Sequence, residues 1–276
     1  PQQIGRYTLQ GRLGQGGMGV VYAAYDPELD RKVAIKVLFG RRDDADERAR
    51  VVREARAMAK LAHPNVVHVY EVGEHEGRVF VAMEYVRGQT LRAWCSAQPR
   101  TWRQTLAVCV QAGHGLAAAH ACGIVHRDFK PENVMIGERP SGVDADRARV
   151  LDFGLARGGH ATDLGTTLTS ESAVSGDSLT NTGAVVGTPA YMAPEQFASA
   201  TVDEAADQFS FCVVLWEGLY GERPFQGRTL VELQRSVTHD KPRAPPPGAK
   251  VPAWLRATIE RGLANVPRDR WPSMQA

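Results

Sequence analysis

Cysteine is scarce in this chain, and its spacing excludes two kinds of stabilising site. The four cysteines are Cys95, Cys109, Cys122 and Cys212. No two of them form a CxxC pair, so the sequence indicates neither a zinc site nor a disulfide framework. We expect reduced thiols that are mostly packed inside the fold.

Long apolar runs and a strong net charge are also missing. The longest apolar stretch covers residues 209–216, which is far too short to cross a bilayer, and no signal peptide is visible. The formal net charge is only +2, so nothing indicates a surface for nucleic acid or membrane. We therefore expect this part of the protein to be cytoplasmic and to contact neither.

What remains is an ordinary globular composition, with 276 residues of which 43% are hydrophobic and 23% charged. That length allows two lobes with separate cores. Residue periodicity predicts strands at 6–13, 20–26, 32–38, 66–74 and 78–84, with a helix at 48–61. Further helices are predicted at 91–97, 101–122, 202–220, 230–237 and 253–264. The pattern predicts an α+β fold with a small antiparallel β lobe, one main helix in it, and a larger, mostly helical lobe.

Two segments depart from this regular pattern. Residues 138–149 form a polar connector between short strands, and residues 158–186 are rich in Gly, Ser and Thr with almost no hydrophobic periodicity. We interpret both segments as loops.

A glycine cluster lies between the first two predicted strands. Gly14, Gly16 and Gly19 match the dinucleotide fingerprint G-x-G-x-x-G. That fingerprint requires a helix after the glycines, whereas a strand follows here, and no Gly-Lys-Ser/Thr sequence supports a Walker loop. A glycine turn between two strands can instead close over nucleotide phosphates, because bare backbone amides approach closely.

Four further motifs follow in a fixed order: VAIK at 33–36, HRDFKPEN at 126–133, DFG at 152–154 and APE at 193–195. Each is a weak signal by itself, but together with the glycine turn they form the protein-kinase signature set. From about Ile4 to its last residue, the chain resembles the eukaryotic-like serine/threonine protein kinases of bacteria.

The resemblance implies a bilobal protein-kinase fold. The small lobe would cover residues 1–83, the hinge 84–88 and the large lobe 89–276, with an activation segment at 152–195. It also implies transfer of the γ-phosphoryl group of ATP to Ser or Thr hydroxyls of protein substrates. The chain would then be one domain of a longer protein, and a further C-terminal segment would anchor that protein to the membrane.

The catalytic loop would supply the chemistry of this transfer. Asp128 would orient the acceptor hydroxyl and take its proton late in the reaction. Lys130, which marks the serine/threonine branch, would neutralise charge on the moving phosphoryl group. Asn133 and Asp152 offer hard oxygen ligands for Mg²⁺, with Mn²⁺ as an alternative, and we expect the metal to arrive with ATP.

Nucleotide binding would depend on a lysine in an apolar strand. A charge there is costly unless it is paired, although a lone lysine can also reach the surface. The resemblance implies that Lys36 holds the α- and β-phosphates and pairs with Glu54, with Glu47 as the second candidate and a solvated helix face as the alternative for Glu54. Residues that would surround adenine are Leu13, Val21, Ala34 and Met135, with Met83 as gatekeeper and backbone hydrogen bonds from Glu84 and Val86.

Regulation would depend on the activation segment. Arg127 would pair with a phosphate on Thr180 or Thr182, added by autophosphorylation, and Thr166, Thr167 and Thr169 are secondary candidates. An unmodified polar loop is the alternative. Phosphothreonine-binding proteins are implied partners, and a transient homodimer through the small lobe is compatible with the resemblance.

Several residues would support the site rather than react. Thr188 would hydrogen-bond near Asp128, Glu195 would pair with Arg270, and Asp207 would brace the catalytic loop. His126 would pack inside the large lobe, and we assign no catalytic role to the other histidines, which lack metal-ligand spacing.

One position departs from the family pattern, because Cys212 stands where the helix usually carries Gly; we expect tolerated packing there. The rival class is a pseudokinase scaffold, which usually lacks the lysine, the catalytic acid or the metal-binding Asp. All of these are present here as Lys36, Asp128 and Asp152. A small-molecule kinase is a further alternative, but it would lack the 187–195 signature.

Overall fold

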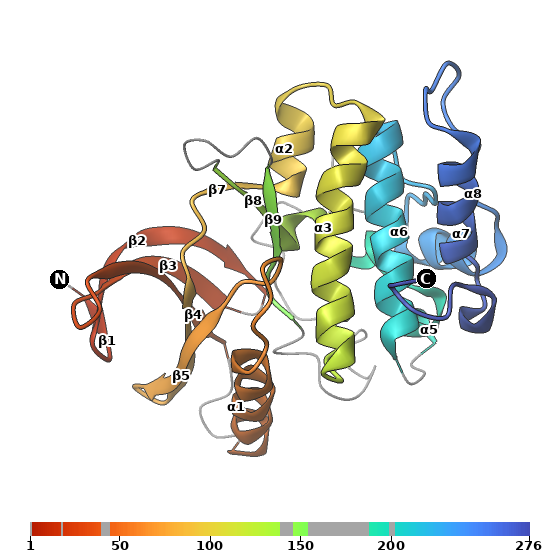
Figure 1. The fold of residues 1–276 in the computed structure, drawn as a ribbon. Helices are drawn as coiled ribbons and strands as arrows, with labels where there is room; N and C mark the ends of the chain where they lie inside the picture. Colours follow the sequence, from red (N-terminus) through yellow and green to blue (C-terminus); the bar gives the residue numbers. More distant parts are fainter. Residues whose placement is uncertain (1, 18, 40–44, 139–145, 154–187, 199–201) are drawn as a thin grey trace.

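The structure has two lobes, a small one built mainly from strands and a larger one built mainly from helices. The computed structural model describes residues 2–17, 19–39, 45–138, 146–153, 188–198 and 202–276. One antiparallel sheet and helix α1 form the first lobe, and the other helices gather on the opposite side of the molecule (Figure 1). This confirms the bilobal α+β fold expected from the sequence.

The small lobe contains a six-stranded sheet in the order β1-β2-β3-β4-β6-β5, with antiparallel neighbours. Its elements are β1 (Gln3–Ile4), β2 (Tyr7–Gly16), β3 (Gly19–Asp26), β4 (Arg31–Leu38), α1 (Ala45–Ala59), β5 (Val69–His75) and β6 (Arg78–Glu84). Strand β6 follows the predicted range 78–84, and α1 begins before the predicted start at residue 48. Gly73 has a packing reason, because a Cβ there would lie 2.5 Å from the Phe80 ring.

The large lobe is mostly helical, with a small three-stranded sheet on the side that faces the small lobe (Figure 1). The strands are β7 (Gly88–Thr90), β8 (Val134–Gly137) and β9 (Arg147–Val150). The helices are α2 (Leu91–Ala97), α3 (Trp102–Ala121), α5 (Pro194–Phe197), α6 (Glu204–Tyr220), α7 (Leu230–His239) and α8 (Ala253–Gly262), with short 3₁₀ turns η1 (Pro131–Asn133), η2 (Thr188–Tyr191) and η3 (Pro267–Asp269). Among the described residues, none of the helices combines the length and apolarity that a membrane crossing needs.

Local signals explain where the two longest helices of the large lobe begin and end. Thr101 and Gln104 form a capping box at the start of α3, so two of its free N–H groups are satisfied. Asp203 accepts a hydrogen bond from the Ala205 N–H at the start of α6. Helix α6 ends at Tyr220, and the Gly221 that follows has a φ of 75°, the left-handed cap that glycine adopts without steric cost.

One large hydrophobic core extends through both lobes. A continuous buried cluster runs from Met58 of the small lobe through Val66 and Val150 to Leu116 of α3. A second, smaller cluster lies around Tyr7 and covers the small-lobe sheet; its buried members are Ile4, Tyr7, Ala24, Val33, Ile35, Phe80 and Ala82.

The segment that follows α1 explains why this core extends from one lobe into the other. The Val67 N–H donates to the Val150 carbonyl at 3.0 Å, and the Val150 N–H donates to the Asn65 carbonyl at 2.8 Å. Close approach is allowed because Gly115 of α3 has no side chain, since a Cβ there would lie 2.5 Å from the Asn65 oxygen. Residues 65–67 are therefore joined by backbone hydrogen bonds to the large lobe.

Candidate active site

The glycine turn leaves open space at two of its three motif glycines. Strands β2 and β3 close at the Gly16–Gly19 pair. A Cβ built on Gly14 or Gly16 would meet no heavy atom within 4 Å, so packing within the chain does not require glycine at either position. At Gly19 a Cβ would lie 2.2 Å from the Val37 oxygen, so the fold itself requires this glycine. Gly14 and Gly16 thus fit a surface that a ligand approaches closely.

Lys36 lies in β4 with its side chain 5% exposed, and its ammonium forms an ion pair with Asp152. The distance from Nζ to Asp152 Oδ1 is 2.8 Å. Asp152 is thus a carboxylate partner of Lys36 that the sequence did not predict, and the expected pairing of Lys36 with Glu54 stays a prediction. A nearly buried ammonium needs an anion, and Asp152 provides one from the other lobe. Glu54 lies half-buried on α1, and the side chain of Glu47 lies outside the described residues.

Asp128 is buried at 8% exposure, and its two carboxylate oxygens differ in their surroundings. Oδ2 accepts a hydrogen bond from Lys130 Nζ at 2.9 Å. Oδ1 is buried and has no hydrogen-bond partner among the described residues. A buried polar atom without a partner is costly and calls for an explanation. Its place in the catalytic loop fits an oxygen that accepts a hydrogen bond from a group outside the chain.

The two expected metal ligands come together through the pairing of β8 with β9. Val134 lies opposite Val150, so Asn133 and Asp152, at adjoining ends of these strands, lie at the same edge. The Leu151 N–H donates to the Asn133 carbonyl at 2.8 Å, and Asn133 Nδ2 donates to the Asp128 carbonyl at 2.8 Å. With Nδ2 thus engaged, an amide oxygen and a carboxylate remain, which are hard donors that fit Mg²⁺. The described residues contain no group of three or more His, Cys, Asp or Glu able to hold a metal.

Asp207 of α6 holds the catalytic loop by its backbone. Oδ2 accepts from the His126 N–H at 2.7 Å, and Oδ1 accepts from the Arg127 N–H at 2.7 Å. Arg127 has a φ of 63°, a left-handed conformation that costs a non-glycine residue about 1–3 kcal/mol unless its surroundings enforce it. The brace expected at Asp207 is present, and it explains how the loop keeps this strained backbone.

Sequence reasoning missed one member of this brace, His120 of α3. Its Nε2 lies 2.8 Å from Asp207 Oδ2, and both side chains are buried. The residues are 87 positions apart, so no motif spacing could have paired them. His126, in contrast, packs as expected: its Nε2 lies 2.9 Å from the Leu151 carbonyl oxygen, and its ring lies 4.8 Å from that of Phe153.

Arg127 presents a polar group that the described structure leaves unsatisfied. Its Nε atom is buried without a hydrogen-bond partner among these residues. The predicted phosphosites Thr180 and Thr182 lie outside the described residues, as do Thr166, Thr167 and Thr169. The side chain of Thr188 also lies outside them, so its expected hydrogen bond near Asp128 stays a prediction.

The residues expected around adenine come from both lobes. Ala34 and Met83 are buried opposite each other on β4 and β6, whereas Leu13 is 50% exposed. Val21 and Val86 are partly buried against the large core, and Met135 of β8 is partly buried. The Glu84 N–H donates to the His68 carbonyl at 2.9 Å, so this N–H is not available to a purine.

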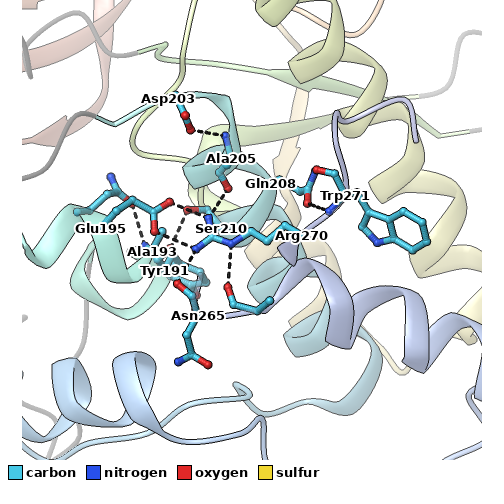
Figure 2. Close-up of polar contacts among 12 residues, drawn as sticks. Tyr191, Ala193, Glu195, Asp203, Ala205, Gln208, Ser210, Asn265, Arg270 and Trp271 are labelled. Carbon is cyan, nitrogen blue, oxygen red and sulfur yellow. Dashed lines mark hydrogen bonds and ion pairs between the residues drawn. The ribbon is translucent and has the colours of Figure 1, made fainter. Parts of the chain in front are cut away.

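Glu195 and Arg270 form the expected ion pair at the base of the large lobe. Arg270 Nη1 and Nη2 donate to the two Glu195 oxygens at 2.7 and 2.9 Å. Figure 2 shows the guanidinium facing this carboxylate and the Ala205 and Asn265 carbonyl groups. The bidentate pair fixes α5, at the end of the activation segment, against the C-terminal turn.

Comparison with known proteins agrees with this geometry. The model of the protein kinase domain family matches residues 7–276. Serine/threonine-protein kinase PknE of Mycobacterium bovis is 36% identical over 98% of this chain and 44% of its own length. Serine/threonine-protein kinase pkn3 of Myxococcus xanthus is 35% identical over 98% of this chain and 48% of its own length. The chain thus belongs to the protein kinase domain family, and it spans less than half the length of these two relatives.

A solved structure gives the same result for the fold. The kinase domain of Mycobacterium tuberculosis PknI superposes with a TM-score of 0.70 at 28% identity, covering 99% of this chain and 94% of that one.

Proposed function

We propose that this chain transfers the γ-phosphoryl group of ATP to Ser or Thr hydroxyls of proteins. The observation that carries the proposal is the buried Oδ1 of Asp128, which has no hydrogen-bond partner among the described residues. Asp128 contacts Lys130 and Asn133, and the Asn133 carbonyl accepts a hydrogen bond from Leu151, the residue before the Asp152 that pairs with Lys36.

Asp128 would act on the acceptor hydroxyl through Oδ1. A hydroxyl placed there would donate its hydrogen bond to Oδ1, which orients the oxygen toward the phosphoryl group and later takes its proton. Lys130 holds the other oxygen, Oδ2, at 2.9 Å and so restricts how the carboxylate rotates. Its ammonium would also offset charge on the phosphoryl group during transfer.

Asn133 and Asp152 would hold Mg²⁺ through their side-chain oxygens. When bound, the metal would supply positive charge that offsets the triphosphate. Lys36 orients Asp152 through their ion pair and would contact the α- and β-phosphates, while Gly14 and Gly16 would let the backbone approach them. Mn²⁺ offers the same charge and coordination number, and is the alternative metal.

The activation segment would control this activity. Arg127 Nε is buried without a partner in the part of the chain that the structure describes, which supports a phosphate contact, since a phosphate brings about −1.5 to −2 charge and strong acceptor oxygens. Thr180 and Thr182 are the proposed sites of autophosphorylation. Phosphothreonine-binding proteins, a transient homodimer and a membrane anchor outside this chain are proposals that rest on family resemblance.

The first experiment is incubation of the protein with Mg-ATP, followed by phosphosite mapping by mass spectrometry and assay on a protein substrate. We expect Asp128→Asn to lower the transfer rate by about 10²–10⁴-fold, the range for loss of a positioned base. Asp152→Asn should abolish metal-dependent transfer. The matched control is Asp269→Asn, the same change at an exposed residue of η3, which should keep the wild-type rate.

The outcome also separates an enzyme from a scaffold. Phosphate on Thr180 or Thr182 in the wild type, but not in Asp128→Asn, supports a self-activating serine/threonine kinase. Nucleotide binding by the wild type without any transfer would contradict the proposal and favour the pseudokinase.

A further inference from the structure

Arg92 of α2 uses three guanidinium nitrogens on three different segments. Nε donates to Glu132 Oε1 at 2.8 Å, and Nη1 donates to Glu217 Oε1 at 3.0 Å. Nη2 donates to the Tyr191 hydroxyl, which in turn donates to Glu217 Oε2 at 2.7 Å. We call these four residues the Arg92 cluster.

The Arg92 cluster lies next to the catalytic loop. Glu132 is the fourth residue after Asp128, so its backbone lies within ~14 Å of that acid at ~3.6 Å per residue. An extended peptide with its hydroxyl at Asp128 would cover that distance in at most about four residues. Tyr191 ends η2, near the end of the activation segment, and its carbonyl accepts from Ser210 Oγ at 2.7 Å. The cluster is therefore within reach of a bound protein substrate.

The charges of the cluster do not balance. Glu132 and Glu217 bring two carboxylates, and Arg92 brings one guanidinium. Burial alone would lower the pKa of Arg92, but Tyr191, Glu132 and Glu217 outweigh it and raise the pKa, so the cation persists. The side chains of Arg92 and Glu132 are 39% and 46% exposed, so both open to the surface that a substrate would contact.

Glu132 and Glu217 accept hydrogen bonds from one planar guanidinium, so their two carboxylates together form a guanidinium-binding site. Arginine suits such a site because its N–H groups match carboxylate oxygens in pairs. Here the chain itself supplies that group. Without Arg92, Glu132 and Glu217 would present an unpaired acidic site within a few residues of the acceptor.

We propose that Arg92 is a specificity-determining residue, which fills from within an acidic site that would otherwise bind an arginine or lysine of the protein substrate. The chain then accepts substrates without requiring a basic residue near the acceptor. This inference rests on the proposed kinase function and names which substrates that function selects.

The test compares peptide pairs that share one acceptor and differ only by arginine or glutamine, at positions two to four residues on either side. We measure kcat/KM for both peptides of each pair and divide the value for the arginine peptide by the value for the glutamine peptide. The wild type should keep this ratio within about threefold at every position. Arg92→Ala should raise it about tenfold or more at one position, the scale of a charge-assisted pair at a partly exposed site.

Further variants separate recognition from damage to the fold. Arg92→Gln removes the charge but keeps an amide donor for Glu217, and should raise the ratio as Arg92→Ala does, even if the alanine variant does not fold. Arg92→Lys should stay near the wild type. Adding Glu132→Gln to Arg92→Gln should remove the gain, because it deletes one carboxylate of the exposed site.

The outcomes distinguish this inference from the function beneath it. An active wild type that already favours arginine peptides tenfold, or an active Arg92→Gln with an unchanged ratio, would overturn the role of Arg92 alone. Failure of the wild type to phosphorylate any of the peptides or a protein substrate would overturn both.

Discussion

Cys212 of α6 packs against a glycine of the neighbouring helix, Gly262 of α8. A Cβ on Gly262 of α8 would lie 2.3 Å from Cys212 Sγ and 3.5 Å from its Cβ. The sulfur of α6 thus occupies the space that glycine leaves free on α8. Burial raises the pKa of the Cys212 thiol to about 12, so the group stays neutral. The tolerated packing expected for Cys212 therefore has a specific basis, a small residue on the facing helix.

A pair of substitutions tests this explanation. Gly262→Ala should lower the free energy of unfolding by about 1–3 kcal/mol, because the added methyl overlaps the sulfur in a packed core. The double variant Cys212→Ala/Gly262→Ala should recover most of that loss, since alanine removes the overlapping atom. Urea denaturation measures both, with Gly11→Ala as the control because a Cβ there would meet no heavy atom within 4 Å. Equal losses in the single and double variants would contradict the contact.

The sequence predicted those site residues whose type and local spacing carry the chemistry. Asp128, Lys130 and Asn133 lie within one motif, so a short stretch was enough to identify them. It predicted neither the Lys36–Asp152 pair nor the contact of His120 with Asp207. Both join residues far apart in the chain, and which carboxylate reaches a buried cation depends on the relative placement of the two lobes.

At the scale of elements, the Glu195–Arg270 pair ties α5 to the turn after α8. The Arg270 side chain is fully buried and that of Glu195 is 10% exposed. Arg270→Ala should lower the free energy of unfolding by about 3–5 kcal/mol, because it leaves a carboxylate buried without its partner. Urea denaturation again measures the change, and Arg268→Ala, an exposed arginine of η3, serves as the matched control. Similar small losses in both variants would show that the ion pair contributes little.

The sequence predicted helices and strands well where they were long enough to display a hydrophobic repeat. Helix α2 and strand β6 follow the predicted ranges 91–97 and 78–84. The short elements β7, η2 and α5 were not predicted, because three or four residues cannot display a hydrophobic repeat. They are also the elements whose existence depends on contacts with distant parts of the chain, as in the pairing of β7 with β8.

At the scale of the whole molecule, the continuous core predicts one unfolding transition. All five tryptophans lie beyond the hinge, so their fluorescence reports on the large lobe, while hydrogen exchange of the β4 amides reports on the small lobe. We expect the two probes to give the same urea midpoint, because Val66 and Val150 belong to one buried cluster. A lower midpoint for β4 would show instead that the sheet unfolds as a separate unit.

The hydrogen bonds between residues 65–67 and Val150 also set how the lobes can move. They attach the large lobe to the chain between α1 and β5, whereas the hinge attaches it at the end of β6. Two attachment points allow the small-lobe sheet to rotate relative to the large lobe but not to separate from it. The nucleotide site would therefore open by a hinge rotation. The lobes would also not fold as independent units. If the chain were cut at the hinge, each fragment would expose the part of the shared core that it buries against the other lobe.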